Sequence, residues 1–148
     1  MLRRILTSAL LFASPALAFS PPPENFERVR EAVENAGHHM SKFGLPFCRE
    51  DGEWCEGDAD EWIRIQAYGR GIIEVMTTSQ LPHSQYRDVC AAAFAGLSGA
   101  AMSFADEVIA EAFQIASAQG SFNQDIQGVE IEVRPSSDDV LGCQFFKY

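Results

Sequence analysis

Apolar residues recur at helical spacing in three segments of the chain, which are about residues 25–36, 84–97 and 104–119. In each segment they fall at i, i+3, i+4 and i+7, which places them along one side of a helix. Residues of the kind that cap helix N-termini precede or open the three segments: Asn25, Ser84 and Ser103. Gly120 follows the last segment, as is typical of a helix end. The sequence therefore predicts three amphipathic helices.

Alternation of apolar and polar residues predicts strands in the rest of the chain. Residues 61–78 alternate on both sides of Gly69-Arg70-Gly71, which predicts a hairpin. Residues 129–133 alternate up to Pro135, and residues 141–148 form the last predicted strand. Residues 38–60 are expected to form a long loop. The order predicts an α+β fold, in which the N-terminal helix and a helical pair pack on one face of an antiparallel sheet of about four strands.

The first eighteen residues form a separate segment. Arg3 and Arg4 give a positive start, residues 5–13 are almost all apolar, and Ala16-Leu17-Ala18 matches a small-x-small cleavage site. This order is typical of a secretory signal peptide. The apolar run 5–13 is too short for a transmembrane anchor, which needs about 20 residues. We expect residues 1–18 to be removed and residues 19–148 to form a single periplasmic or extracellular domain without a membrane span.

All four cysteines lie beyond the predicted cleavage site, at Cys48, Cys55, Cys90 and Cys143. An even number of cysteines in an exported chain predicts two disulfides, for which three pairings exist. Cys48 and Cys55 are close in sequence, so we favour their pairing and, with it, a Cys90–Cys143 bridge. The alternatives are a four-cysteine zinc site or a redox-active pair. Both are disfavoured because the sequence contains no C-x-x-C motif.

The net charge narrows the classes of partner. The chain has 11 basic and 21 acidic residues, for a formal net charge of −10. Cleavage after Ala18 would remove two arginines and no acid, so the mature chain would carry −12. Nucleic acids and anionic membranes select basic surfaces, so an acidic chain argues against both. Basic proteins, cations and neutral ligands remain as candidate partners, and among them we favour a basic exported protein.

Acidic residues concentrate between positions 50 and 61, and two tryptophans accompany them: Trp54 lies within this stretch and Trp62 directly follows it. The candidate binding residues are Glu50, Asp51, Glu53, Trp54, Glu56, Asp58 and Asp60. A calcium site is an alternative for this stretch, but the Asp58-x-Asp60 fragment lacks the glycine and the terminal glutamate of a calcium loop. A plain solvated loop is the other alternative.

Candidate catalytic chemistry is sparse. The sequence contains no nucleophile elbow, paired-carboxylate signature, H-E-x-x-H motif or phosphate loop, and no cofactor is predicted. The leading hypothesis is a non-catalytic binding or inhibitor-type protein. The alternative is a small periplasmic metal-binding protein or hydrolase that uses His38, His39, His83 and the acidic stretch 50–61. Convergence of the three histidines with two carboxylates in one pocket would favour this alternative.

Overall fold

The computed structural model describes residues 24–40, 47–49, 54–60, 62–69, 71–77, 83–135 and 141–148. These residues form three helices: α1 (Glu24–Asn35), α2 (His83–Ser98) and α3 (Met102–Gln119). They also form seven strands: β1 (Phe47–Cys48), β2 (Trp54–Ala59), β3 (Ile63–Tyr68), β4 (Ile72–Thr77), β5 (Phe122–Ile126), β6 (Val129–Pro135) and β7 (Leu141–Phe146).

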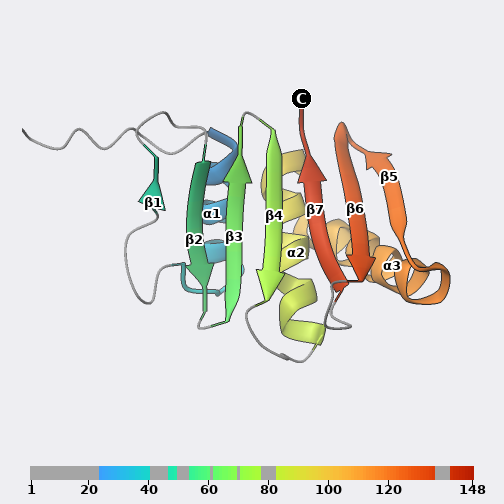
Figure 1. Ribbon diagram of the computed structural model, residues 1–148. Helices are drawn as coiled ribbons and strands as arrows, with labels where there is room; N and C mark the ends of the chain where they lie inside the picture. The colour runs from blue at the N-terminus through green and yellow to red at the C-terminus, as the bar shows by residue number, and fades with distance from the viewer. Residues whose placement is uncertain are drawn as a thin grey trace, which may run out of the picture.

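The strands form one antiparallel sheet in the order β1-β2-β3-β4-β7-β6-β5. Two meanders, β1 to β4 and β5 to β7, meet where β4 pairs with β7 at the centre of the sheet. The three helices lie together on one face, with α1 behind β2 and β3 in the view of Figure 1 and α3 near β5 and β6. The α+β fold with all described helices on one face is therefore as predicted.

The predicted number of about four strands is too low, because the sheet has six strands of five or more residues and the two-residue β1. Both β1 and β2 fall in the predicted loop 38–60. The sequence of β2 is Trp-Cys-Glu-Gly-Asp-Ala, and its glycine and acids are poor strand formers. Strand β5 escaped prediction because Asn123, Gln124 and Asp125 are polar and exposed at the edge of the sheet. The 61–78 hairpin matches β3 and β4 closely.

The helix positions agree with the sequence, but the predicted N-caps do not. Asn25 and Ser84 are each the second residue of their helix, and α3 begins at Met102 after Ala101, which makes no side-chain cap. Ser103 is thus inside α3, and no acidic residue occupies its first turn. The C-terminal end of α3 is as predicted, because Gly120 has a φ of 89° and its N–H donates to the carbonyl of Ala116.

The helix layer is held together by close packing of α1 against α2. Gly96 makes this approach possible: a Cβ at this position would lie 2.6 Å from the carbonyl oxygen of Arg28 and 2.9 Å from the Cβ of Ala32. Three consecutive alanines of α2, Ala91 to Ala93, are fully buried beside it. The small side chains explain why this uncharged part of α2 packs inside the protein.

Both predicted disulfides are present. Cys48 pairs with Cys55, its register partner across β1 and β2, and Cys90 of α2 pairs with Cys143 of β7. The second bridge spans 53 positions and links the helix layer to a central strand. The first spans 7 positions and ties the short edge strand β1 to its neighbour. Within the part of the chain that the structure describes, no cysteine is free.

Candidate functional site

The face of the sheet opposite the helices, called the outer face below, has no described helix or strand over it (Figure 1). Strand alternation decides which side chains reach it, since neighbouring residues point to opposite faces. Cys55, Gly57 and Ala59 of β2 are buried toward the helices, and the residues between them point outward. The same holds for β3 and β7. The outer face therefore carries the alternate, mostly partly exposed residues of each strand.

Five register-matched residues form a line across the outer face, which we call the carboxylate row. Its members on β2, β3, β4, β7 and β6 are Glu56, Gln66, Glu74, Gln144 and Glu132. Carboxylates and carboxamides alternate along this line, so like charges are kept two strands apart. Gln66 Nε2 donates to Glu56 Oε2 at 3.3 Å. The amide thus separates two carboxylates that would repel each other if adjacent.

Only two cationic side chains of the described strands point to the outer face, and both are engaged. Arg64 Nε donates to Asp58 Oδ1 at 2.9 Å, and its guanidinium lies 4.0 Å from Glu56. Arg134 pairs with Glu132. The structure describes no basic partner of Glu74. The described carboxylates on this face are Glu56, Asp58, Glu74, Asp125, Glu130 and Glu132, so the face carries a net negative charge.

A second line of register partners, two residues along the strands, is apolar and is called the apolar row. It consists of Trp54, Tyr68, Ile72 and Phe146, on β2, β3, β4 and β7. All four side chains are partly exposed. The guanidinium carbon of Arg49 lies 5.3 Å from the centre of the Trp54 ring, within the range of a cation–π contact. The outer face therefore already holds one cation on an aromatic ring.

Tyr68 joins the two rows. Its hydroxyl donates to the side-chain oxygen of Gln66. Burial raises the pKa of Tyr68 above its ordinary value, and the negative charge of Glu74 raises this pKa further. The neutral hydroxyl is favoured beside a carboxylate because ionisation would place two negative charges together. This part of the outer face is consequently suited to cations and to hydrogen-bond donors.

The structure divides the predicted binding stretch. Trp54, Glu56 and Asp58 share the outer face of β2, whereas Asp60 lies beyond the end of that strand. Glu50, Asp51 and Glu53 lie outside the described residues. The stretch is thus partly a strand and not the loop that the sequence predicts. Its described acids act with β3, β4, β6 and β7, which sequence spacing alone did not bring together.

Asp60 forms a clasp with the end of α1. His38 Nδ1 and Asp60 Oδ2 are 2.8 Å apart, and the backbone N–H of His39 donates to Asp60 Oδ1 at 3.2 Å. The backbone N–H of Asp60 donates to the carbonyl of His39 at 2.9 Å. Burial opposes ionisation of Asp60, but the hydrogen bonds from His38 and His39 outweigh burial and lower its pKa. Asp60 also has a φ of 56°, so the clasp holds a sharp turn.

The hypothesis of a histidine site requires three histidines and two carboxylates to converge, and the structure shows only one such side-chain contact. His38 reaches one carboxylate, His39 contributes its backbone, and the side chain of His83 is outside the described part of the structure. Among the described residues, no group of three or more histidine, cysteine, aspartate or glutamate side chains converges. The His38–Asp60 pair is therefore explained by its role at the helix end.

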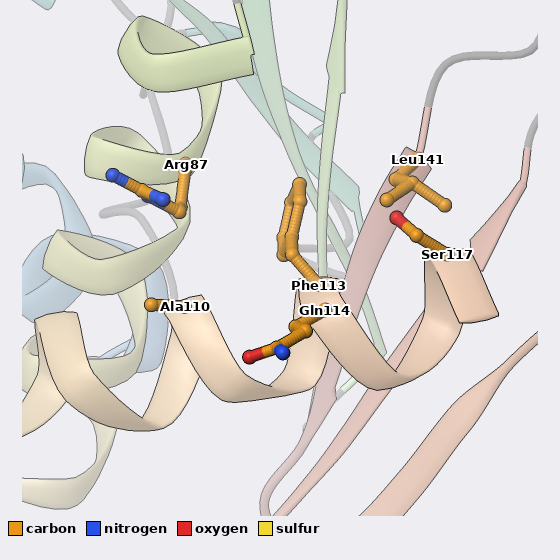
Figure 2. A pocket seen from close by; sticks show the side chains of 6 residues that line it. All are labelled: Arg87, Ala110, Phe113, Gln114, Ser117 and Leu141. Atoms are coloured by element: carbon orange, nitrogen blue, oxygen red, sulfur yellow. The ribbon is translucent and has the colours of Figure 1, made fainter.

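A shallow pocket of about 310 Å³ lies on the helix side of the sheet. Figure 2 shows its lining side chains, which come from α2, α3 and β7: Arg87, Ala110, Phe113, Gln114, Ser117 and Leu141. Arg87 is the only ionisable side chain among them. Ser117 thus has no acid–base partner within this lining, and the pocket offers no nucleophile–base pair.

Sequence reasoning missed the residues of the site that lie outside the acidic stretch. Gln66, Tyr68, Glu74 and Phe146 were assigned to strands, and their alternation was the signal that could have placed them on one face. Of the helices that the structure describes, none has the length and apolarity needed to cross a bilayer. Comparison of the chain with protein-family models, curated proteins and solved structures finds no match.

Proposed function

We propose that the protein is exported and acts as a non-catalytic binding or inhibitor-type partner of a basic exported protein. The observation that carries this proposal is the outer face, where partly exposed aromatic side chains lie beside an excess of carboxylates. Aromatic groups supply contact area, and fixed charges of one sign select partners of the opposite sign. The two disulfides support an oxidising compartment.

The experiment that tests binding is affinity capture from periplasmic extract with the mature protein as bait. We expect one basic protein to be retained at low salt and released as ionic strength rises, because salt screens interfacial charges. A mature bait with reduced and alkylated cysteines serves as the unfolded control. If only proteins shared with that control are retained, the proposed function is wrong.

Export is tested separately by N-terminal sequencing of the protein recovered from the periplasm or the medium. The expected first residue is Phe19, within one or two positions, because cleavage follows the Ala16-Leu17-Ala18 site. Recovery of the chain in the cytoplasm with Met1 intact would contradict export.

A further inference from the structure

We propose that the outer face is a docking surface for a basic amphipathic helix of the partner protein. This inference rests on the proposed function and specifies its partner. Glu56 and Glu74 of the carboxylate row supply the charge contacts, and the apolar row supplies the hydrophobic contacts. The two rows run side by side, about 7 Å apart, since each lies two residues from the other along the strands.

Charge decides the class of occupant. Arg64 and Arg134 are engaged with carboxylates of the same face, so the net charge offered to a partner is negative. A second copy of this chain would bring the same acids against it, and like charges across an interface are unfavourable. The contact of Arg49 with Trp54 shows that the aromatic side chains of this face accept a guanidinium. A cationic partner can therefore form charge contacts with the carboxylate row and cation–π contacts with the aromatic side chains of the apolar row.

Spacing favours a helix over an extended peptide. Glu56 and Glu74 stand two strands apart, so their carboxylates are about 10 Å apart, whereas Glu132, the next carboxylate of the row, is buried and paired with Arg134. Residues seven apart on a helix share one side and are separated by about 10.5 Å. An extended chain presents same-side residues at about 7 or 13 Å. Lysines or arginines two helical turns apart therefore match the carboxylate row, whereas those of a strand do not.

The helix axis would run across the strands from β2 to β7. This path covers three strand spacings, about 14 Å, and an 18-residue helix of about 27 Å is long enough. An apolar stripe beside the basic residues would lie on Tyr68, Ile72 and Phe146, which are adjacent register partners. Because these side chains are only partly exposed, they offer a shallow surface that a helix can cover without rearrangement of the sheet.

The test uses a synthetic 18-residue peptide with lysines at positions 2 and 9, which match Glu56 and Glu74, and a leucine stripe on the adjoining side. The Glu56→Gln/Glu74→Gln variant removes two charges from the carboxylate row with little change of shape. The matched control, Glu107→Gln/Glu111→Gln, removes two charges from exposed positions of α3. We expect calorimetry to show at least tenfold weaker binding to the first variant and less than twofold weakening for the control.

A peptide of the same composition with its lysines distributed around the helix should bind wild type at least fivefold more weakly. Three results would each overturn the docking surface: no binding of the designed peptide, equal loss in both variants, or equal binding of both peptides. Affinity capture separates this failure from failure of the proposed function. If wild type and Glu56→Gln/Glu74→Gln retain the same basic partner equally, the proposed function stands and the outer face is the wrong surface.

Discussion

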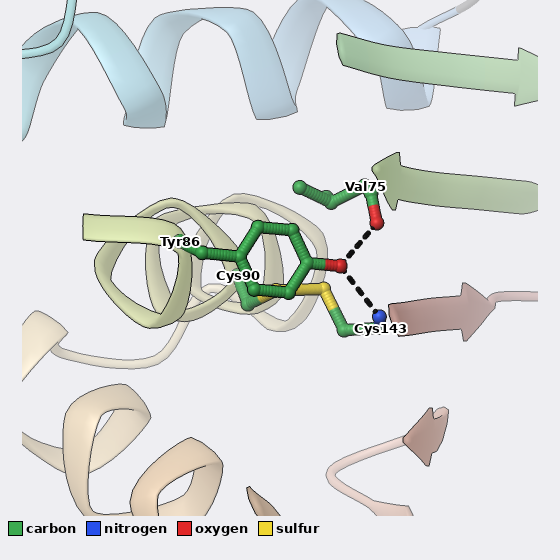
Figure 3. The surroundings of a disulfide bond; sticks show 4 residues. All are labelled: Val75, Tyr86, Cys90 and Cys143. Carbon is green, nitrogen blue, oxygen red and sulfur yellow. Dashed lines mark hydrogen bonds between the residues drawn. A yellow bond between two sulfur atoms is a disulfide. The ribbon is translucent and has the colours of Figure 1, made fainter. Parts of the chain in front are cut away.

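The hydroxyl of Tyr86 lies between the central strands of the sheet and accepts a hydrogen bond of 2.9 Å from the backbone N–H of Cys143. The same hydroxyl donates to the carbonyl of Val75, as Figure 3 shows. Val75 and Cys143 are the last register pair of β4 and β7, so a side chain from α2 completes the pairing of the two meanders. Burial raises the pKa of Tyr86 far above its ordinary range, which keeps the hydroxyl neutral.

Removal of this hydroxyl should destabilise the protein more than its size suggests. Tyr86→Phe would leave a buried N–H and a buried carbonyl without a partner, at a cost of about 1–3 kcal/mol in the free energy of unfolding. Urea denaturation measures this difference. Tyr68→Phe is the control, because that hydroxyl is partly exposed and water can replace its bond. A Tyr86→Phe variant as stable as the control would contradict the bridging role.

The Cys90–Cys143 disulfide should contribute more stability than Cys48–Cys55. Its closed loop is much longer, and in the chain-entropy model a longer loop restricts the unfolded chain more. We expect Cys143→Ser to lower the free energy of unfolding by about 2–5 kcal/mol. Cys55→Ser should cost less.

Denaturation of the two variants in parallel compares their stabilities directly, and thiol titration checks the pairing. In Cys143→Ser the thiol of Cys90 is buried, so it should react only after unfolding. A larger loss of stability in Cys55→Ser would contradict the ranking. A Cys48–Cys90 linkage in peptides mapped without reduction would contradict the pairing itself.

The Asp60 clasp should make part of the stability depend on pH. Because the pKa of Asp60 is lowered by folding, its stabilising contribution is present above the unfolded pKa of about 3.9 and is lost as pH falls through the folded pKa. Asp60→Asn keeps a side chain that tolerates the left-handed backbone but removes the charge. We expect this variant to be less stable than wild type by about 0.2–1 kcal/mol at pH 7.

The difference between the two proteins should be smaller at pH 3 than at pH 7, because acidification below the unfolded pKa of about 3.9 begins to remove the contribution of the carboxylate. Chemical denaturation at both pH values measures it, with Asp106→Asn, an exposed residue of α3, as the charge control. A gap that stays constant or widens on acidification would show that the carboxylate does not stabilise this clasp.

The helices, the 61–78 hairpin and both disulfides could be predicted because each depends on local periodicity or on cysteine counting. The strands β5 and β2, at or next to the edges of the sheet, could not be predicted in this way. Strand β5 has few apolar residues to alternate, and only the turn at Gln127 and Gly128, where φ is 55° and 73°, signals its hairpin. In β2 the inward positions are Cys55, Gly57 and Ala59, which are small and weakly apolar. These segments adopt strand conformation because they pair with a neighbouring strand, and not because their residues have a high strand propensity.

The candidate site was only partly visible for a related reason. The acids of β2 lie close to other acids in the sequence, so composition alone points to the stretch around Glu56. Glu74 and Glu132 lie outside the acidic stretch, and Phe146 is one apolar residue among several in its segment. The β2-β3-β4 meander brings Glu74 beside Glu56, whereas Glu132 and Phe146 join this face only because β7 inserts between β4 and β6. This long-range pairing of the two meanders is not encoded in any local pattern.

The most direct test of the central claim is a nuclear magnetic resonance titration of the isotope-labelled mature protein with the lysine–leucine helix peptide. If the outer face binds the basic helix, the perturbed signals will cluster on β2, β3, β4 and β7, with the largest changes in the side chains of Trp54, Tyr68 and Phe146. Perturbations centred on α3 and the Arg87 pocket, or spread evenly over the molecule, would contradict the account.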